Sequence, residues 1–376
     1  MALTTRTPAD TPEETDLVTE RTAAVIAAGS QGRVHARGWS SVAGVRLAAI
    51  ADPIAGAAAE LAGEYDGVAA YDDATAMLQE LRPEFVSVCT PPSVRLDVVR
   101  AAIAAGARAI HAEKPIATSY GDALAMVAEA QDAGVQLTFN LQRRFEPVHR
   151  FARSRIVEGA IGDIVSIEGY CPNLPDWGTH IFDLILFYLG DEAPEWVIGQ
   201  VDVTVNRFVY GAFAETSSLT QVKWPSNINA VVMTGREPQT PVLNLANNTG
   251  LIVQGTSGRI ESRGSRCLVQ RFGADDELFP TPHSTDASTW ERGIDPAIFA
   301  ATAEAIADLV DALDTGREPV LSARRGLAGA ELIFATYESS RSRRRVILPL
   351  DLTDNPLLDG LAQGFWAPTG EQRSTY

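Results

Sequence analysis

A glycine-containing turn near the start of the chain places the strongest constraint on the fold. Residues 27–32 read Ala-Ala-Gly-Ser-Gln-Gly, between an apolar run at residues 23–28 and a helical stretch that continues to Trp39. Gly29 would let the backbone approach a bound pyrophosphate, and Gly32 would let the helix pack closely against the strand. Unpaired N–H groups and the positive end of the helix dipole favour an anion there. The pattern predicts a dinucleotide site on a strand–turn–helix unit.

A carboxylate at the end of the next expected strand supports this interpretation. Residues 45–51 are an apolar strand-like run, and Asp52 follows it twenty residues after Gly32. This is the separation expected for a carboxylate that binds the adenosine ribose. Because such a carboxylate repels a 2′-phosphate, we expect NAD rather than NADP as the cofactor. The alternative is that Asp52 is a helix N-cap. The expected cofactor-binding residues of this part are Gly29, Ser30, Gln31, Gly32 and Asp52.

The chain between residues 21 and 140 alternates strand-like and helical segments. We expect strands at residues 23–28, 45–51, 85–89, 108–111 and 136–139. The helical segments between them include residues 73–80, 95–105 and 119–133. Alternation at this rhythm predicts a parallel sheet with helices on both faces. The first domain is therefore expected to be an α/β, doubly wound Rossmann domain.

The pattern changes after Asn140, where strand-like segments follow one another at hairpin spacing. Strands are expected at residues 162–169, 196–205, 218–224, 228–235, 242–247, 251–255, 258–262 and 267–272. Helices are expected at residues 147–158, 177–189 and 297–313. This spacing predicts an α+β domain with a large, open and mostly antiparallel sheet. Helices would cover one face, and a second copy of the chain would cover the other, as a homodimer or homotetramer.

The resulting domain plan has four parts. Residues 1–20 are expected to be a disordered tail and residues 21–140 the dinucleotide-binding domain. Residues 141–353 would form a substrate and oligomerisation domain, and residues 354–376 an extended C-terminal tail.

Composition and charge exclude several classes of function. The 376 residues carry a net charge of −17, which disfavours nucleic acid as a partner. The longest apolar stretch, residues 181–189, is too short to span a membrane and contains Asp183. The three cysteines share no CxxC spacing, so we expect reduced thiols, no metal site and a cytoplasmic protein. The Ala- and Arg-rich composition hints at a high-GC genome.

Two further segments carry groups suited to proton chemistry. Glu113-Lys114-Pro115 places a lysine on a turn that the following proline restrains. Asp176, His180 and Asp183 have helical spacing, so they would share one face of an otherwise apolar, buried helix. Charged groups on a buried helix need partners or a cavity. The alternative is structural: Asp176 caps the helix, Asp183 fixes a loop, and His180 is a satisfied core histidine.

Removal of a hydride from an alcohol carbon requires a base for the hydroxyl proton and a positive group beside the developing alkoxide. His180 suits the first task, because the unperturbed pKa of histidine is ~6.5. Lys114 suits the second task, and Asp176 would orient the imidazole. The catalytic candidates are therefore Lys114, Asp176 and His180, with the division of proton transfer between Lys114 and His180 left open.

Two residues beside these candidates are expected to contact the substrate. Arg143 follows the last strand of the first domain, so it should line the cleft as a substrate or nicotinamide contact, or else be a solvated arginine. Trp177 could stack on a sugar face, and a core tryptophan is the alternative. The expected substrate-binding residues are Lys114, Arg143, Asp176, Trp177 and His180. Asn140, Gln142 and Arg144 should also line the cleft.

The quoted segments, together with Cys89-Thr90-Pro91-Pro92, resemble the glucose–fructose oxidoreductase / inositol dehydrogenase (Gfo/Idh/MocA) family. The resemblance covers roughly residues 21 to 350. It implies a Rossmann domain followed by an open-sheet α+β domain, and NAD(P)-dependent oxidation or reduction of sugars and cyclitols. It also implies that Thr90, Pro91, Glu113, Lys114 and Arg143 bind the cofactor. Two departures are Ala27, in place of the first fingerprint glycine, and Arg95, where many relatives have a histidine.

The leading hypothesis is an NAD-dependent dehydrogenase that oxidises a secondary hydroxyl of a sugar, aminosugar or cyclitol. Because such enzymes often serve antibiotic-sugar pathways in high-GC genomes, a role in antibiotic-sugar biosynthesis is expected. One alternative is an NADPH-dependent reductase of a keto-sugar, which Asp52 disfavours. Another is a glycosidase that uses bound NAD for transient oxidation. A ligand sensor without chemistry is a further alternative, which the joint presence of Lys114, Asp176 and His180 disfavours.

Overall fold

The computed structural model describes residues 20–235, 249–279 and 293–374. The expected N-terminal tail and the expected strand at residues 242–247 lie outside these ranges, apart from Glu20. Within them, no helix is long and apolar enough to cross a membrane.

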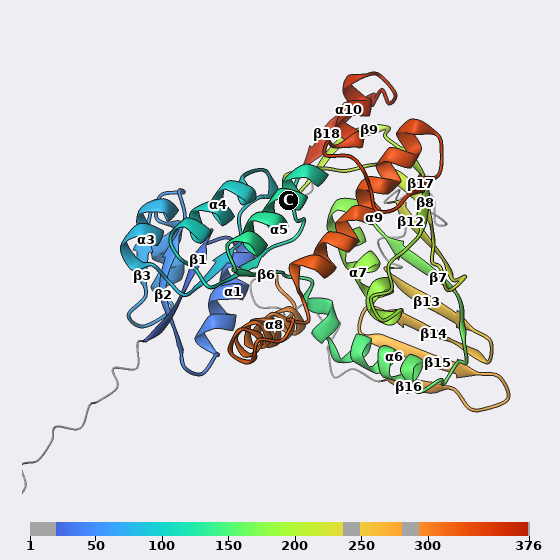
Figure 1. Ribbon diagram of the computed structural model, residues 1–376, viewed down its shortest axis with the longest axis horizontal. Helices are drawn as coiled ribbons and strands as arrows, with labels where there is room; N and C mark the ends of the chain where they lie inside the picture. The colour runs from blue at the N-terminus through green and yellow to red at the C-terminus, as the bar shows by residue number, and fades with distance from the viewer. Residues whose placement is uncertain (1–19, 236–248, 280–292, 375–376) are drawn as a thin grey trace, which may run out of the picture.

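The first domain is a six-stranded parallel sheet with the strand order β3-β2-β1-β4-β5-β6 (Figure 1). The strands are β1 (Arg21–Ile26), β2 (Val45–Ala51), β3 (Ala69–Tyr71), β4 (Phe85–Val88), β5 (Ala109–Ala112) and β6 (Gln136–Phe139). The connecting helices are α1 (Ser30–Ser40), α2 (Ala57–Ala62), α3 (Ala74–Leu81), α4 (Pro92–Ala104) and α5 (Tyr120–Asp132). The predicted Rossmann arrangement is confirmed. The sequence analysis missed only the three-residue strand β3, which is too short to show a pattern.

The second sheet has nine strands in the order β16-β15-β14-β13-β7-β12-β11-β8-β17. Its strands are β7 (Ile164–Cys171), β8 (Trp196–Asp202), β11 (Ser217–Lys223), β12 (Asn229–Gly235), β13 (Gly250–Gly255), β14 (Gly258–Arg263), β15 (Arg266–Arg271), β16 (Glu277–Phe279) and β17 (Val346–Ile347). The pair β7–β12 is parallel, and the other neighbouring pairs are antiparallel. The predicted large, mostly antiparallel sheet is confirmed.

Helices cover the face of this sheet that is turned toward the first domain (Figure 1). They are α6 (Pro147–Val157), α7 (Thr179–Tyr188) and α9 (Ala323–Ser342). The packing is close: a Cβ on Gly169 of β7 would lie 2.7 Å from Ile181 Cγ2 of α7. Helix α9 packs against β8, α7 and α5, so it joins the two halves of the molecule. The sequence analysis did not predict α9.

The two halves are not separate along the sequence. Helix α8 (Pro296–Thr315) comes late in the chain but packs against α1 of the first domain. Its Ile306 and Leu309 share a hydrophobic cluster with Trp39 and Leu47. The Rossmann core is therefore completed by a segment from beyond the second sheet, and the domain boundary near residue 140 describes the order along the chain rather than the packing.

A small three-stranded sheet, β10-β9-β18, lies beside the first domain at one end of the molecule (Figure 1). It contains β9 (Val205–Val209), β10 (Ala212–Phe213) and β18 (Gly370–Ser374). The expected extended tail from residue 354 is wrong for its first part, because Pro356–Ala362 form helix α10. The Asn355 side chain accepts hydrogen bonds from Leu357 N and Leu358 N, which is an ordinary N-cap. The tail then returns as β18, parallel to β9.

Candidate active site

The glycine turn has the close packing that a dinucleotide fingerprint requires. A Cβ on Gly32 would lie 1.9 Å from Ala27 O, so this position admits only glycine. Gly29 is the N-cap of α1 and has no atom within 4 Å of its Cβ position, which leaves the helix N-terminus open. Ala27, at the place of the first fingerprint glycine, has φ of 80°. The turn thus keeps the left-handed conformation that glycine would adopt more easily.

Asp52 lies at the carboxyl end of β2, directly beside this turn. Its carboxylate accepts hydrogen bonds from Ala28 N at 2.7 Å and from Ile54 N at 2.8 Å. The N-cap of α2 is Gly56, so the alternative role of Asp52 as the cap of that helix is wrong. Arg33 on α1 pairs with Glu64, which lies just after α2. Ribose binding by Asp52 stays a prediction.

Arg95 has a role that the sequence did not reveal. It lies on α4, is 1% exposed, and donates hydrogen bonds to Thr90 O and Pro115 O. Burial lowers the pKa of its guanidinium to about 10. Arg95 therefore ties together the two turns that carry the predicted cofactor contacts Thr90 and Lys114. It acts from inside the domain, so it is not placed to contact a bound cofactor at the surface.

Glu113 faces the interior beneath the Lys114 turn. Its carboxylate accepts from Asn140 Nδ2 at 2.7 Å and lies 3.0 Å from His35 Nε2. Burial raises the pKa of Glu113, but the hydrogen bond with His35 and the nearby charges outweigh burial and lower the pKa to about 2. Its Oε2 also accepts from Lys114 N at 3.1 Å. Any contribution of the Glu113 side chain to cofactor binding would thus act through the position of Lys114.

Lys114 and Asp176 meet across the two halves of the molecule. Lys114 Nζ hydrogen-bonds Asp176 Oδ1, and the two side chains are 11% and 6% exposed. The Tyr210 ring, in the turn between β9 and β10, lies 4.7 Å from the same Nζ. The expectation that Asp176 orients His180 needs correction, because the carboxylate holds the ammonium of Lys114 instead. Asp176 precedes α7, in the turn formed by Leu174–Gly178.

His180 is the group beside this pair that remains available for proton transfer. It lies in the first turn of α7 and is 4% exposed, and its Nδ1 has no hydrogen-bond partner among the described residues. Burial and the positive charges of Arg143 and Lys114 hold the pKa of His180 well below its usual value. The imidazole is therefore neutral at neutral pH, as a base must be.

Arg143 and Trp177 lie with His180 around one pocket of about 390 Å³, part of which is open solvent. The Arg143 guanidinium lies 4.5 Å from the Trp177 ring centroid, and the rings of Trp177 and His180 are 6.2 Å apart. Arg143 also pairs with Glu146 at 3.1 Å, while its Nε has no hydrogen-bond partner in the part of the chain that the structure describes. The structure brings these three predicted substrate contacts together.

Asp183 does not belong to the site. It is 1% exposed and forms a close ion pair with Arg144, in which Arg144 Nε lies 2.9 Å from Asp183 Oδ1. Arg144 also pairs with Asp191 at 2.8 Å. The structural alternative for Asp183 is therefore the correct one, and Arg144 does not line the cleft. Asn140 is likewise buried against Glu113.

The sequence holds one further signal for Lys114, and it holds none for Arg95 or Tyr210, whose contacts with the site were not predicted. The chain contains only two lysines, Lys114 and Lys223, among 31 basic residues. A lysine can lose its proton and a guanidinium cannot, so a lysine in an arginine-rich chain marks a position with special chemistry. Arg95 shares α4 with the charged residues Asp97 and Arg100, so its place in that helix did not distinguish it. Tyr210 could not be predicted either, because its contact with Lys114 depends on how the β9–β10 turn folds over the first domain.

The comparisons with known proteins show that the first domain is similar to NAD-binding oxidoreductases. Residues 21–141 match the family model described as an oxidoreductase family with an NAD-binding Rossmann fold. The chain is 27% identical to inositol 2-dehydrogenase of Rhizobium meliloti, over 86% of this chain and 97% of that protein. It is 27% identical to D-apiose dehydrogenase of Paraburkholderia graminis, over 91% of this chain and 93% of that protein.

A solved structure extends the fold likeness to both halves. An oxidoreductase from Agrobacterium radiobacter, crystallised with NAD+, L-tartaric acid and magnesium, matches with a TM-score of 0.73 and 22% identity. The match covers 88% of this chain and 98% of that chain. The chain is therefore similar to NAD-binding oxidoreductases of the Gfo/Idh/MocA family, which is the family that the sequence analysis named, and the predicted fold class is confirmed. Within the described ranges, no group of three or more His, Cys, Asp or Glu side chains is placed to hold a metal.

Proposed function

We propose that this protein oxidises a secondary hydroxyl of a sugar, aminosugar or cyclitol and uses NAD as the hydride acceptor. The observation that carries the proposal is the pairing of Lys114 with Asp176 beside the buried, neutral His180. The named relatives act on inositol and on D-apiose, which are both polyhydroxylated.

The residues present fit a dinucleotide. The close approach at Gly32 and the open N-terminus of α1 at Gly29 would hold the pyrophosphate. Asp52 at the end of β2 would hold the ribose hydroxyls, and its negative charge favours NAD over NADP. Ser30, Gln31, Thr90 and Pro91 lie on the same edge of the sheet, where parallel strands end.

Each side chain of the site has a separate task. Bound NAD would take the hydride from the carbon that carries the reacting hydroxyl. His180 is neutral, and its unpartnered Nδ1 can accept the hydroxyl proton. The Lys114 ammonium donates to the same oxygen and stabilises the developing negative charge. Asp176 keeps that ammonium in place through their ion pair. Lys114 can take up the hydroxyl proton only after it has given one of its own protons to a neighbour such as Asp176 or His180, and the division of proton transfer between Lys114 and His180 stays open.

The test is reduction of the cofactor, followed by absorbance over a panel of sugars, aminosugars and cyclitols. We expect NAD reduction with at least one polyol and a kcat/KM for NADP at least tenfold lower than for NAD, because Asp52 repels a 2′-phosphate. Preference for NADP would contradict the role of Asp52. Tight cofactor retention without net NADH would favour the glycosidase alternative. The antibiotic-sugar pathway and the cytoplasmic location stay predictions.

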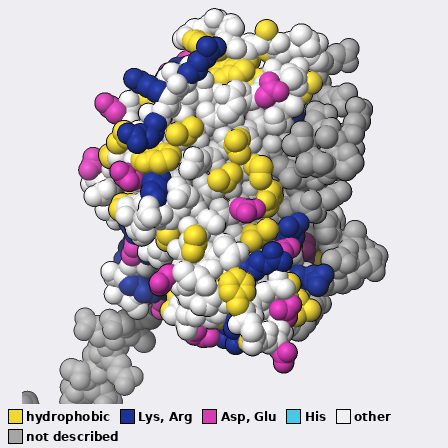
Figure 2. All heavy atoms as spheres, turned by 90° about the vertical axis from the view of Figure 1, so that its right-hand side faces the viewer, with side chains coloured by type: hydrophobic (Ala, Val, Ile, Leu, Met, Phe, Trp, Pro, Cys, Tyr) yellow, Lys and Arg dark blue, Asp and Glu magenta, His cyan; other side chains and the backbone are white. Residues whose placement is uncertain are grey.

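We further propose that the outer face of the nine-stranded sheet joins two copies of the chain. Among the described residues, this face carries no helix in Figure 1, and apolar side chains lie across its middle in Figure 2. Ile198 of β8 and Leu219 of β11 are 44% and 50% exposed on adjacent strands. Apolar side chains on an open sheet face are typical of an interface.

The oligomeric state is tested by size-exclusion chromatography, with the molar mass of the eluted protein measured by light scattering. We expect a dimer or tetramer for the natural chain and a smaller species for the double variant Ile198→Lys/Leu219→Lys. Val94→Lys on α4, which is 46% exposed, is the matched control. A monomeric natural chain would contradict the proposal.

A further inference from the structure

A second pocket lies directly beside the Lys114–Asp176 pair. It has about 600 Å³ of empty space, part of which is open solvent, and this is within the usual size of small-molecule sites. Its lining includes Pro115, which follows Lys114, together with Pro175 and Thr179 on either side of Asp176. Lys114 and Asp176 are therefore each adjacent in sequence to a residue that lines this pocket.

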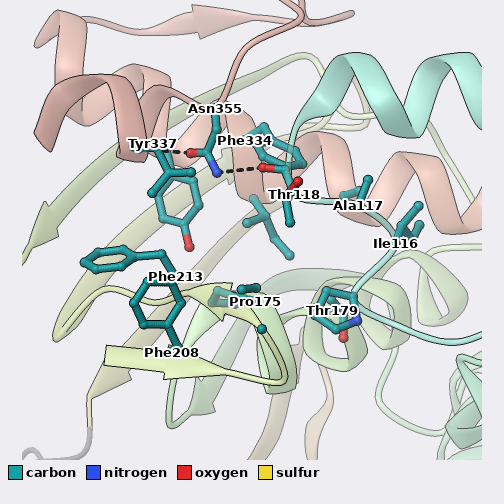
Figure 3. Close-up of a pocket in the computed structure, with 16 residues that line it drawn as sticks. Ile116, Ala117, Thr118, Pro175, Thr179, Phe208, Phe213, Phe334, Tyr337 and Asn355 are labelled. Carbon is teal, nitrogen blue, oxygen red and sulfur yellow. Dashed lines mark hydrogen bonds between the residues drawn. The ribbon is translucent and has the colours of Figure 1, made fainter. Parts of the chain in front are cut away.

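The remaining walls are almost entirely apolar. Phe208 and Phe213 come from the β9–β10 arm, Phe334 and Ile333 from α9, and Leu358 from α10. In Figure 3, the rings of Phe208, Phe213 and Phe334 lie around the cavity together with Tyr337 and Pro175. Such a surface offers little to the hydroxyl groups of an unsubstituted polyol.

Three of the four polar side chains in the lining, Thr179, Tyr337 and Asn355, already have partners within the protein. Thr179 Oγ1 donates to Asp176 O at 2.5 Å, and Tyr337 Oη donates to Glu215 Oε2 at 3.0 Å. Asn355 Nδ2 donates to Thr118 O at 2.8 Å, a bond visible in Figure 3. The pocket therefore offers a ligand few side-chain groups for hydrogen bonding, and an apolar ligand would leave these three groups satisfied.

The pocket that contains His180 is different. It holds Arg143 and His180, each with a buried nitrogen that has no hydrogen-bond partner among the described residues. Unsatisfied buried donors and acceptors favour a polar ligand. The segment from Pro175 to Ile181 lines both pockets, with Pro175 and Thr179 in the apolar one and Trp177, His180 and Ile181 in the polar one.

We infer that the apolar pocket receives a hydrocarbon or aromatic substituent of the substrate, while the polyol part lies with His180. The inference rests on the proposed function and narrows its substrate class to polyols or sugars that carry an apolar group. Burial of a phenyl ring against such walls favours the substituted substrate by about ten- to hundredfold.

The test uses a variant that fills the pocket. Ala330 lies on α9 in the pocket lining and is 7% exposed, so Ala330→Leu removes space without losing helix propensity. Ala328→Leu, on the same helix but outside the lining, is the matched control. Leu358 of α10 also lines the pocket and is 40% exposed, so Leu358→Trp should narrow the pocket without disturbing the core. This variant replaces Ala330→Leu in the test if Ala330→Leu fails to fold.

Two measurements are made on each protein. The first is kcat/KM for the O-phenyl and O-methyl derivatives of the polyol that reduces NAD best. The second is binding of benzyl alcohol, which carries no polyol, by ligand-observed NMR with the phenyl derivative as competitor.

We expect the natural chain and Ala328→Leu to prefer the phenyl derivative at least tenfold and to bind benzyl alcohol competitively. Ala330→Leu should reduce that preference to threefold or less and leave the rate with the methyl derivative within twofold. Equal kcat/KM for the two derivatives in the natural chain would overturn the inference, as would an equal loss of both rates in Ala330→Leu. Absence of NAD reduction by every polyol is a distinct outcome that overturns the proposed function, and the substrate role of the pocket with it.

Discussion

At the scale of single residues, two buried ion pairs have different roles. Lys114–Asp176 belongs to the candidate active site, and Arg144–Asp183 stabilises the fold. Lys114–Asp176 is next to an unpartnered histidine nitrogen, whereas Arg144–Asp183 is enclosed and fully paired. Both aspartates lie on one short segment and look equivalent in the sequence. They differ in their partners in the folded protein. Asp176 pairs with Lys114 of the first domain, and Asp183 pairs with Arg144 of the turn that follows that domain.

The supporting pair predicts a specific pattern of stabilities. Arg144→Met should lower the free energy of unfolding by about 3–5 kcal/mol, because it leaves the Asp183 carboxylate buried without its partner. The double variant Arg144→Met/Asp183→Leu should recover much of this loss, since no buried charge then remains unpaired. Urea denaturation of the three proteins measures the effect. A double variant that is less stable than Arg144→Met would show that the pair does more than neutralise Asp183.

At the scale of elements, the glycine turn makes opposite predictions for two neighbouring positions. Gly32→Ala should weaken NAD binding at least tenfold and destabilise the protein by about 1–3 kcal/mol, because the added Cβ meets Ala27 O. Ala27→Gly should raise the free energy of unfolding by up to about 1 kcal/mol, since glycine adopts the positive φ without strain. Calorimetry of NAD binding and urea denaturation measure both. A stabilised Gly32→Ala variant would contradict the close packing.

The elements that the sequence predicted are those with a repeating local pattern. The strands β2 and β6 match their expected bounds, because each is a short apolar run between turn residues. Helix α9 was missed because Gly326 and Gly329 interrupt its helical pattern. The structure gives a reason for one of them: a Cβ on Gly326 would lie 2.6 Å from Phe139 Cδ2. The need for glycine at residue 326 arises from a contact between distant parts of the chain, so the sequence around α9 does not reveal it.

The site shows the same limit. Lys114, Asp176, His180, Arg143 and Trp177 were all found from residue type and spacing, and the structure gathers them. Their mutual contacts were not predicted, because the partner of Asp176 depends on how the two halves pack. Helix α10 is different, since Asn355 and Pro356 are a recognisable N-cap and first position that the expectation of an extended tail overlooked.

At the scale of the whole molecule, buried histidines make stability depend on pH. Burial lowers the pKa of His111 and of His149 to about 3, and it lowers the pKa of His180 well below its usual value. Below pH ~6.5 these side chains take up protons in the unfolded chain but not in the folded one. Stability therefore falls as the pH falls through 6.5, by about 1.4 kcal/mol per pH unit for each histidine.

Urea midpoints at pH 7, 6 and 5 check this dependence. We expect the free energy of unfolding to decrease at each step, and His149→Gln to show a shallower slope than the natural chain. Glu113, whose folded pKa of about 2 lies below its unfolded value, adds to the loss only under more acidic conditions. Stability that stays constant from pH 7 to pH 5 would show that the histidines are protonated in the folded protein.

The central claim is that the Lys114 ammonium, held by Asp176 beside His180, assists proton removal from a substrate hydroxyl. The most direct measurement is the single-turnover rate of NAD reduction for Lys114→Met, with Lys223→Met, the chain's other lysine, as the matched control. At saturating NAD, we predict a rate about 10²–10⁴-fold below the natural chain for Lys114→Met, with the control unchanged. A Lys114→Met enzyme within threefold of the natural rate would contradict the account.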